Sequence, residues 1–75
     1  VVYMLYGDHS PPHFHARYGD FEILVEIESG IVEGRFPRKA LKAVLDWHEL
    51  HREELMVNWK RAEERKELLS IPPLG

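Results

Sequence analysis

Three of the five histidines in this 75-residue chain lie close together, in the stretch GDHSPPHFHARYGD. They are His9, His13 and His15, and Asp8 precedes the first of them. Imidazole nitrogens bind zinc, nickel, copper and iron, and a neighbouring carboxylate completes a mixed coordination shell. Imidazoles also exchange protons near neutral pH, which suits acid–base catalysis. The stretch is therefore a candidate metal site or catalytic site.

Two prolines and a strand bring these histidines together. Pro11 and Pro12 fix their own φ angles and form a stiff, extended entry to a strand that begins at His13. His13 and His15 are two positions apart on that strand, so they project from the same face. We expect the Pro-Pro turn to hold His9 nearby. The candidate metal ligands are His9, His13, His15 and Glu26, with Asp8 as the other available carboxylate, and the same three histidines are the catalytic candidates.

The stretch lacks the companions that most catalytic sites have. The chain contains no cysteine, and no His-x-x-Glu-His pattern, Gly-rich phosphate loop or nucleophile accompanies the histidines. The alternative that these imidazoles only donate hydrogen bonds to a carbonyl or a carboxylate therefore stays open. We expect a proton-sensitive surface cluster that accepts a divalent transition metal with modest affinity.

Short β-type runs separated by turn residues fill the first half of the chain. The predicted strands span residues 1–6, 13–18, 21–28 and 31–36. The pairs Gly19-Asp20 and Ser29-Gly30 are typical of two-residue hairpin turns, which predicts an antiparallel meander of three or four strands.

The hairpin turns also predict the register of the strands. A two-residue turn at Gly19-Asp20 places His13 opposite Glu26, and a second one at Ser29-Gly30 places Glu26 opposite Glu33. In that register His13, His15, Glu26 and Glu33 share the sheet face that points away from the core.

A helical period follows, from Pro37 to about Glu67, and proline suits the first turn of a helix. Its apolar stripe, which is expected to cover the sheet, contains Leu41, Val44, His48, His51, Leu55, Trp59 and Ala62. The fold class is therefore α+β, an antiparallel three- or four-stranded meander with one long C-terminal helix packed on one face. Residues 68–75 would form a C-terminal strap, and the whole chain, residues 1–75, would be a single domain.

Three apolar residues of the helix lie off this stripe: Trp47, Leu50 and Val57. A monomer would leave them partly in water, and such a patch on a small domain predicts self-association or a partner surface. The alternative is that the chain's own strap folds over them.

The composition narrows the possible partners and the compartment. Ten Lys and Arg against thirteen Asp and Glu give a net charge of −3, so broad attraction to nucleic acid is not expected. The longest apolar run, VVYMLY, is too short to span a bilayer. Without cysteines or a secretory leader, the cytoplasm is the expected location. The chain starts at Val1 without an initiator methionine, so we expect further residues before it.

The motifs resemble a known family. The runs DHSPPHFHARYG, PRKAL and ELHREELMVNW closely resemble the bacterial family catalogued as domain of unknown function 4160, whose motifs are HxPPHFHxxYG and LHxxELxxNW. The matching positions are His9, Pro11, Pro12, His13, Phe14, His15, Tyr18 and Gly19 in the first motif, and Leu50, His51, Glu54, Leu55, Asn58 and Trp59 in the second.

The resemblance implies a role but no reaction, because that family has no established biochemical activity. Its genes commonly lie beside those of another small family, domain of unknown function 2442, in pairs discussed as toxin–antitoxin-like modules. We therefore expect a small cytoplasmic bacterial protein-interaction module, one component of such a pair. The alternative is a metal-dependent or His-based hydrolase acting on nucleic acid or a nucleotide, which would need the histidines to converge on a cleft open to solvent.

Overall fold

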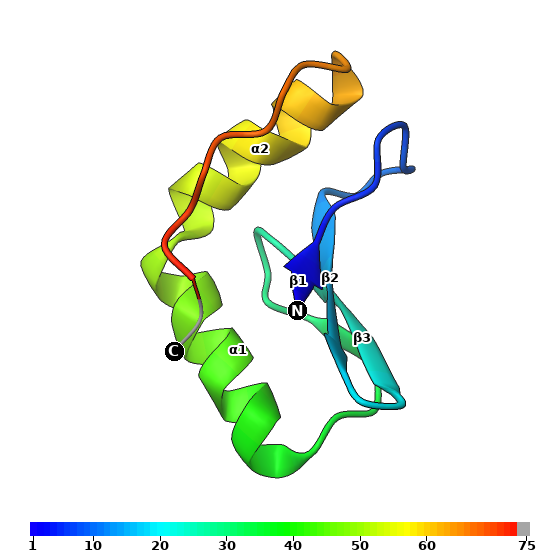
Figure 1. The fold of residues 1–75 in the computed structure, drawn as a ribbon, viewed down its shortest axis with the longest axis vertical. Helices are drawn as coiled ribbons and strands as arrows, with labels where there is room; N and C mark the ends of the chain where they lie inside the picture. The colour runs from blue at the N-terminus through cyan, green and yellow to red at the C-terminus, as the bar shows by residue number, and fades with distance from the viewer. Residues whose placement is uncertain (74–75) are drawn as a thin grey trace.

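The computed structural model describes residues 1–73 and contains one four-stranded sheet covered on one face by helices (Figure 1). The strands pair in chain order, all antiparallel: β1 (Val2–Tyr3), β2 (His13–Tyr18), β3 (Phe21–Glu26) and β4 (Val32–Gly34). The predicted α+β class and antiparallel meander are confirmed. The first, third and fourth strands are shorter than predicted, and β2 has the predicted bounds.

The β2–β3 hairpin has the register predicted from its turn. Tyr18 pairs with Phe21 and His13 pairs with Glu26. Gly19 has a φ of 58°, a left-handed conformation that a tight hairpin turn requires and that glycine adopts without strain. The turn therefore decides which side chains of β2 face the core and which face the other way.

The β3–β4 register differs from the prediction by two positions. Val25 pairs with Val32 and Leu24 pairs with Glu33, so the predicted pairing of Glu26 with Glu33 is wrong. A shift by two positions keeps each side chain on its face of the sheet, because strand side chains alternate with a period of two. The correction therefore changes the neighbours of Glu26 but not the side of the sheet on which it lies.

A wider turn after Glu26 explains the shift. The Ser29 hydroxyl donates to Glu26 Oε1 at 2.9 Å and accepts a hydrogen bond from the Ile31 N–H at 3.2 Å. Ile27 lies just beyond the end of β3, and its carbonyl accepts a hydrogen bond from His48 Nε2 at 2.6 Å. The conformation of this loop thus depends on side-chain hydrogen bonds, which the Ser29-Gly30 turn pattern does not reveal.

Two helices replace the single helix expected over residues 37–67, so that expectation is wrong. They are α1 (Arg38–Leu50) and α2 (Arg52–Glu63), with a break at His51, whose φ and ψ are −119° and 23°. Ordinary α-helical values are near −63° and −42°. No part of either helix is long and apolar enough to span a bilayer.

The break has a local cause. Two acidic residues, Glu53 and Glu54, occupy the first turn of α2, where negative charge favours a helix start. The His51 ring donates from Nδ1 to Glu54 Oε1 at 2.7 Å. The second helix consequently leans away from the axis of the first and follows the sheet (Figure 1).

The core lies between the sheet and the two helices. Its buried residues are Phe14, Ala16, Ile23, Val25, Ile27, Val44, Trp47, Leu55 and Trp59. Most of the predicted helical stripe is buried, including Val44, Leu55 and Trp59, whereas Leu41 is only half-buried.

The segment after α2 returns along the helices and covers Trp47. The Trp47 Nε1 donates to the Pro72 carbonyl oxygen at 2.9 Å, and the Asn58 amide donates to the Leu69 carbonyl and accepts from the Leu69 N–H. The expectation that a monomer leaves Trp47 partly in water is wrong, because this segment of the same chain buries it. Residues 74 and 75 of the predicted strap lie outside the described residues.

Candidate functional site

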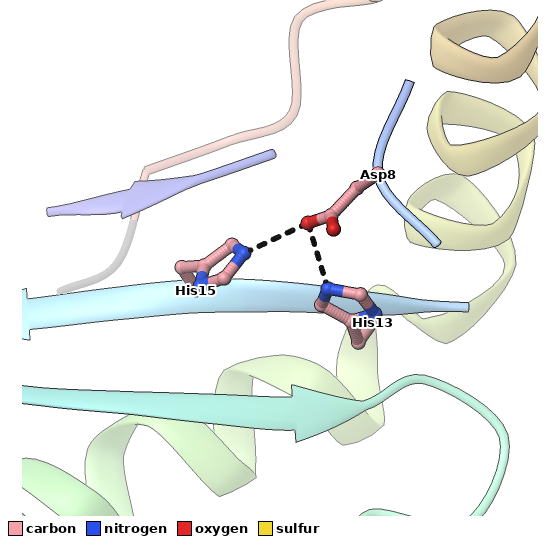
Figure 2. Close-up of side chains that lie close together, drawn as sticks. All are labelled: Asp8, His13 and His15. Atoms are coloured by element: carbon pink, nitrogen blue, oxygen red, sulfur yellow. Dashed lines mark hydrogen bonds and ion pairs between the residues drawn. The ribbon is translucent and has the colours of Figure 1, made fainter. Parts of the chain in front are cut away.

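Strand β2 presents two imidazoles to one carboxylate. The His13 Nε2 lies 2.8 Å from Asp8 Oδ2, and the His15 Nε2 lies 3.1 Å from the same oxygen atom. Figure 2 shows both rings turned toward the Asp8 side chain. Because β2 is hydrogen-bonded to β1 on one side and β3 on the other, both histidines rest on a well-supported strand. We call these three residues the Asp–His cluster.

The loop between β1 and β2 delivers Asp8 to the cluster. Its Oδ1 accepts a hydrogen bond from the His9 backbone N–H at 2.9 Å, which holds the side chain within the loop. Within this loop the chain turns at Gly7, whose φ of 72° again needs the conformational freedom of glycine. One carboxylate oxygen is thus fixed by the loop, and the other faces the strand.

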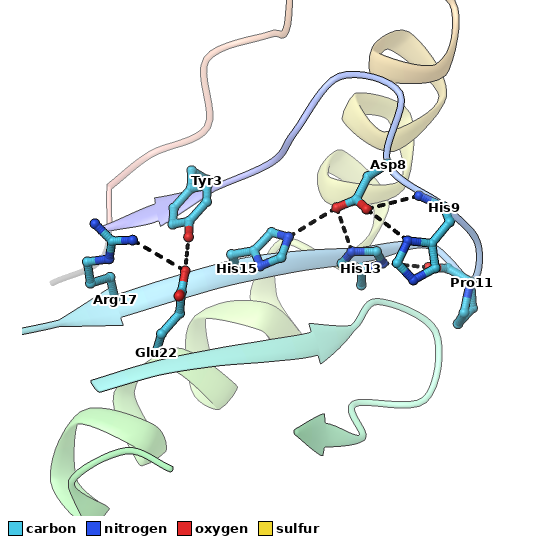
Figure 3. A network of polar contacts seen from close by, with 8 residues as sticks. All are labelled: Tyr3, Asp8, His9, Pro11, His13, His15, Arg17 and Glu22. Atoms are coloured by element: carbon cyan, nitrogen blue, oxygen red, sulfur yellow. Dashed lines mark hydrogen bonds and ion pairs between the residues drawn. The ribbon is translucent and has the colours of Figure 1, made fainter. Parts of the chain in front are cut away.

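The His13 ring is held on all sides. Its Nδ1 lies 2.7 Å from the Pro11 carbonyl oxygen, and its Nε2 lies 2.8 Å from Asp8 Oδ2 (Figure 3). The Trp59 ring lies against it, with 5.0 Å between ring centroids, and only 1% of His13 is exposed. His13 therefore lies on the predicted face of the sheet, but the expectation that it belongs to a surface cluster is wrong, because the loop and α2 cover this end of the sheet.

A stacking contact with β1 positions His15. Its ring stacks on Tyr3 with centroids 5.0 Å apart and planes 12° apart. The Tyr3 hydroxyl donates to Glu22, which also lies 3.6 Å from an Arg17 nitrogen. Polar contacts therefore continue along this face of the sheet from the cluster to the β2–β3 hairpin (Figure 3).

The surroundings keep Asp8 ionised. Desolvation by the fold alone would raise the pKa of its carboxyl group, but hydrogen bonds from His15, the His9 backbone and His13 outweigh it and lower the pKa to about 2. At neutral pH the cluster therefore contains a carboxylate that accepts hydrogen bonds from two imidazoles.

The structure brings together only part of the predicted ligand set. Potential ligand atoms of Asp8, His13 and His15 lie within 4.8 Å of one another. His9 is adjacent, with its Nδ1 at 3.1 Å from Asp8 Oδ1, but 84% of its side chain is exposed. Glu26 is not in the group, since its carboxylate accepts the Ser29 hydroxyl hydrogen bond instead.

Sequence reasoning missed two features of this site. Asp8 was expected only as one of two possible carboxylates, yet it is the residue on which the imidazoles converge. Trp59 was expected to cover the sheet, but its contact with the His13 ring was not expected. No pattern of spacing in the sequence indicates that contact.

The other two histidines take separate partners. His48 is buried and donates to the Ile27 carbonyl, and His51 is paired with Glu54. A groove of about 480 Å³ lies between β1 and the returning C-terminal segment, and within the described chain none of the histidines lines it. This groove therefore does not provide the cleft over the histidines that the hydrolase alternative would need.

Two of the three predicted partner-surface residues are on the surface. Leu50 is 78% exposed and Val57 is 46% exposed, whereas Trp47 is in the core. The exposed pair is separated by seven positions, which places both on one side of the helical segment.

The fold and the cluster define a small α+β protein with a two-histidine, one-carboxylate donor set. The family model described as "Domain of unknown function (DUF4160)" matches residues 1–60. The chain therefore belongs to this family, as its motifs predicted. The matched region contains the whole Asp–His cluster and Trp59. No curated protein and no solved structure matches the chain.

Proposed function

We propose that the chain is a small bacterial, cytoplasmic protein-interaction module and one component of a toxin–antitoxin-like pair. Its proposed companion is the small protein of the domain of unknown function 2442 type. The observation that carries the proposal is the exposed apolar pair Leu50 and Val57, which we call the helix patch.

Exposing the apolar side chains of the helix patch to water is unfavourable in free energy. Two large apolar side chains exposed two turns apart on one side of a helical segment favour an interaction site on so small a domain. The helical winding continues through His51, whose N–H donates to the Trp47 carbonyl and whose carbonyl accepts from the Leu55 N–H. Both patch residues are therefore presented on one continuous surface.

The charges around the helix patch indicate the chemistry of the partner. Asp46 lies one turn before Leu50, and Glu53 and Glu54 lie on the turn between Leu50 and Val57. All three carboxylates are exposed. A complementary surface would place apolar side chains on Leu50 and Val57 and Lys or Arg side chains against the carboxylates between them. We expect the companion to present such an alternation of apolar and basic side chains.

Co-expression with the companion tests the proposal. The companion should co-purify with the native chain, and growth should depend on whether one or both proteins are produced. The double variant Leu50→Ser/Val57→Ser should lose the companion. Phe21→Ser is the matched control, because Phe21 is 45% exposed, like Val57, but lies at the β2–β3 turn.

Two results would overturn the proposal of an interaction module. One is a native chain that neither retains the companion nor self-associates in sedimentation at high concentration. The other is a companion that is retained equally by the native chain and the double variant.

The alternative function is a metal-dependent or His-based hydrolase acting on nucleic acid or a nucleotide. The convergence of Asp8, His13 and His15, with His9 exposed beside them, favours it. Such an enzyme would act without a companion. Hydrolysis of RNA, DNA or nucleotides by the purified chain with Zn²⁺ or Mn²⁺, abolished in Asp8→Asn, would support this alternative.

A further inference from the structure

We propose that the Asp–His cluster binds one divalent transition-metal ion through His13 Nε2, His15 Nε2 and a carboxylate oxygen of Asp8. This goes beyond the interaction module, because the site lies on β2 and its loop rather than on the helix patch. It also replaces the ligand set expected from the sequence, since His9 and Glu26 are not in it.

The donor atoms are already near the spacing that a metal ion needs. Zinc binds imidazole nitrogen at about 2.0–2.1 Å, which separates neighbouring ligands by about 2.8–3.0 Å in octahedral geometry and about 3.3–3.4 Å in tetrahedral geometry. The two nitrogen–oxygen separations are 2.8 and 3.1 Å, and all three donor atoms lie within 4.8 Å of one another. A small shift of the Asp8 carboxylate would let an ion sit between the three donor atoms while both rings stay in place.

The surroundings have the second layer of contacts that metal-binding histidines usually have. A ligating histidine typically donates its other ring N–H to a carbonyl or carboxylate, which fixes the ring and the nitrogen that faces the metal. His13 does this through Nδ1 to the Pro11 carbonyl at 2.7 Å. The Trp59 ring on one side and the loop on the other leave His13 almost no freedom to turn.

The position of His15 supports the same conclusion. One histidine would be enough to hold the loop through Asp8, but two rings from one strand face direct their Nε2 atoms at a single oxygen. Stacking on Tyr3 fixes the plane of the His15 ring. Both Nε2 atoms are thus held toward one carboxylate oxygen. This arrangement matches the two-histidine, one-carboxylate ligand set found in metal sites.

The donor types select the kind of ion. Imidazole favours zinc, iron, nickel and copper, whereas magnesium and calcium prefer shells made of oxygen ligands. Three protein ligands also leave at least one coordination position for water or a group from outside the chain. His9, exposed beside Asp8, lies on the solvent side of the cluster.

Metal titration of the full chain, without any companion, tests this proposal. The protein is freed of metal with a chelator, titrated with Co²⁺ while its visible absorption is followed, and then titrated with Zn²⁺ in competition. We expect one ion per chain. The affinity for the metal should fall by at least about tenfold in Asp8→Asn and in His15→Ala, because even the loss of a residue that only supports a ligand typically weakens metal binding this much.

Controls separate the cluster from other histidines on the surface. His9→Ala and His51→Gln should each change the affinity by less than about threefold, because neither ring belongs to the cluster. Circular dichroism checks that each variant is folded. If Asp8→Asn or His15→Ala unfolds, imidazole resonances of the native chain decide: Zn²⁺ should shift those of His13 and His15 before those of His48 and His51.

Three results would overturn the proposal. They are no stoichiometric binding of Co²⁺ or Zn²⁺ by the native chain, unchanged affinity in both Asp8→Asn and His15→Ala, or Zn²⁺ shifts confined to histidines outside the cluster. None of them bears on the companion assay, so the two proposals fail independently.

Discussion

The chain uses its histidines in two different ways, on the strand and on the helices. On β2, His13 and His15 direct the same ring nitrogen, Nε2, at one carboxylate oxygen of Asp8. On the helices, His48 and His51 have separate partners, a buried carbonyl and the Glu54 carboxylate. Both pairs are close in sequence, but only the strand pair converges.

The difference shows that spacing alone does not make a site. Two positions on a strand place side chains on one face, and so do three positions on a helix. What separates the pairs is the third group: a loop brings Asp8 between the rings of the strand pair, whereas the helix break gives His51 its own acidic neighbour. Convergence therefore depends on the loop, not on the histidines.

The largest expected effect is on the helix side of this comparison. His48→Ala should lower the free energy of unfolding by about 2–4 kcal/mol, because it leaves a cavity and a buried Ile27 carbonyl without a donor. Urea denaturation measures the loss. The folded variant should keep the metal affinity of the native chain, and a loss below about 0.5 kcal/mol would contradict a structural role for His48.

A smaller loss of stability is expected on the strand side. In metal-free protein, Asp8→Asn should lower the free energy of unfolding by about 1–2 kcal/mol, because hydrogen bonds from two imidazoles to a charged acceptor are weakened. Glu22→Gln is the control, since Glu22 is an exposed acceptor on the same face and should cost less than about 0.5 kcal/mol. Equal losses of stability in the two variants would show that the convergence of two imidazoles on Asp8 adds nothing to the stability of the fold.

Acid should remove the contribution of Asp8. The fold lowers the pKa of this carboxyl group from 3.8 to about 2, so its stabilisation is complete above 3.8 and is lost as the pH falls toward 2. The stability difference between metal-free native chain and Asp8→Asn should therefore shrink across this window. Urea melts at a series of pH values measure it, and a difference that grows toward pH 2 would have the wrong sign.

The smallest effect is expected for the carboxylate partner of the helix pair. Glu54→Gln should cost about 0.2–0.5 kcal/mol, because a partly exposed pair within one helical turn contributes little. It is the counterpart of Asp8→Asn and should leave metal affinity unchanged. A thermal melt that places its cost at or above that of Asp8→Asn would reverse the ranking of the two regions.

Where local chemistry decides the structure, the sequence was informative. The β2–β3 register follows from the Gly19-Asp20 turn and is confirmed, as is the shared face of His13 and His15. The β3–β4 register was wrong because the Ser29 hydroxyl widens the turn, a contact that turn patterns do not encode.

Features that depend on contacts distant in sequence could not be predicted. No proline or glycine marks the helix break at His51, so periodicity predicted one continuous helix. The choice of Asp8 over Glu26 depends on how a loop folds onto a strand, and Glu26 had a suitable position but a competing partner in Ser29. The burial of Trp47 required the returning chain to reach it.

The bend between the helices has an optical consequence. The chain contains two tryptophans, and each lies against a different imidazole: Trp59 on His13, with centroids 5.0 Å apart, and Trp47 on His51, at 5.4 Å. A charged imidazole quenches indole fluorescence by accepting an electron from the excited ring. Trp47→Phe would therefore leave Trp59 as the single tryptophan, and its fluorescence intensity would report changes at the Asp–His cluster. Trp59→Phe would leave Trp47, whose fluorescence intensity would report changes at the bend.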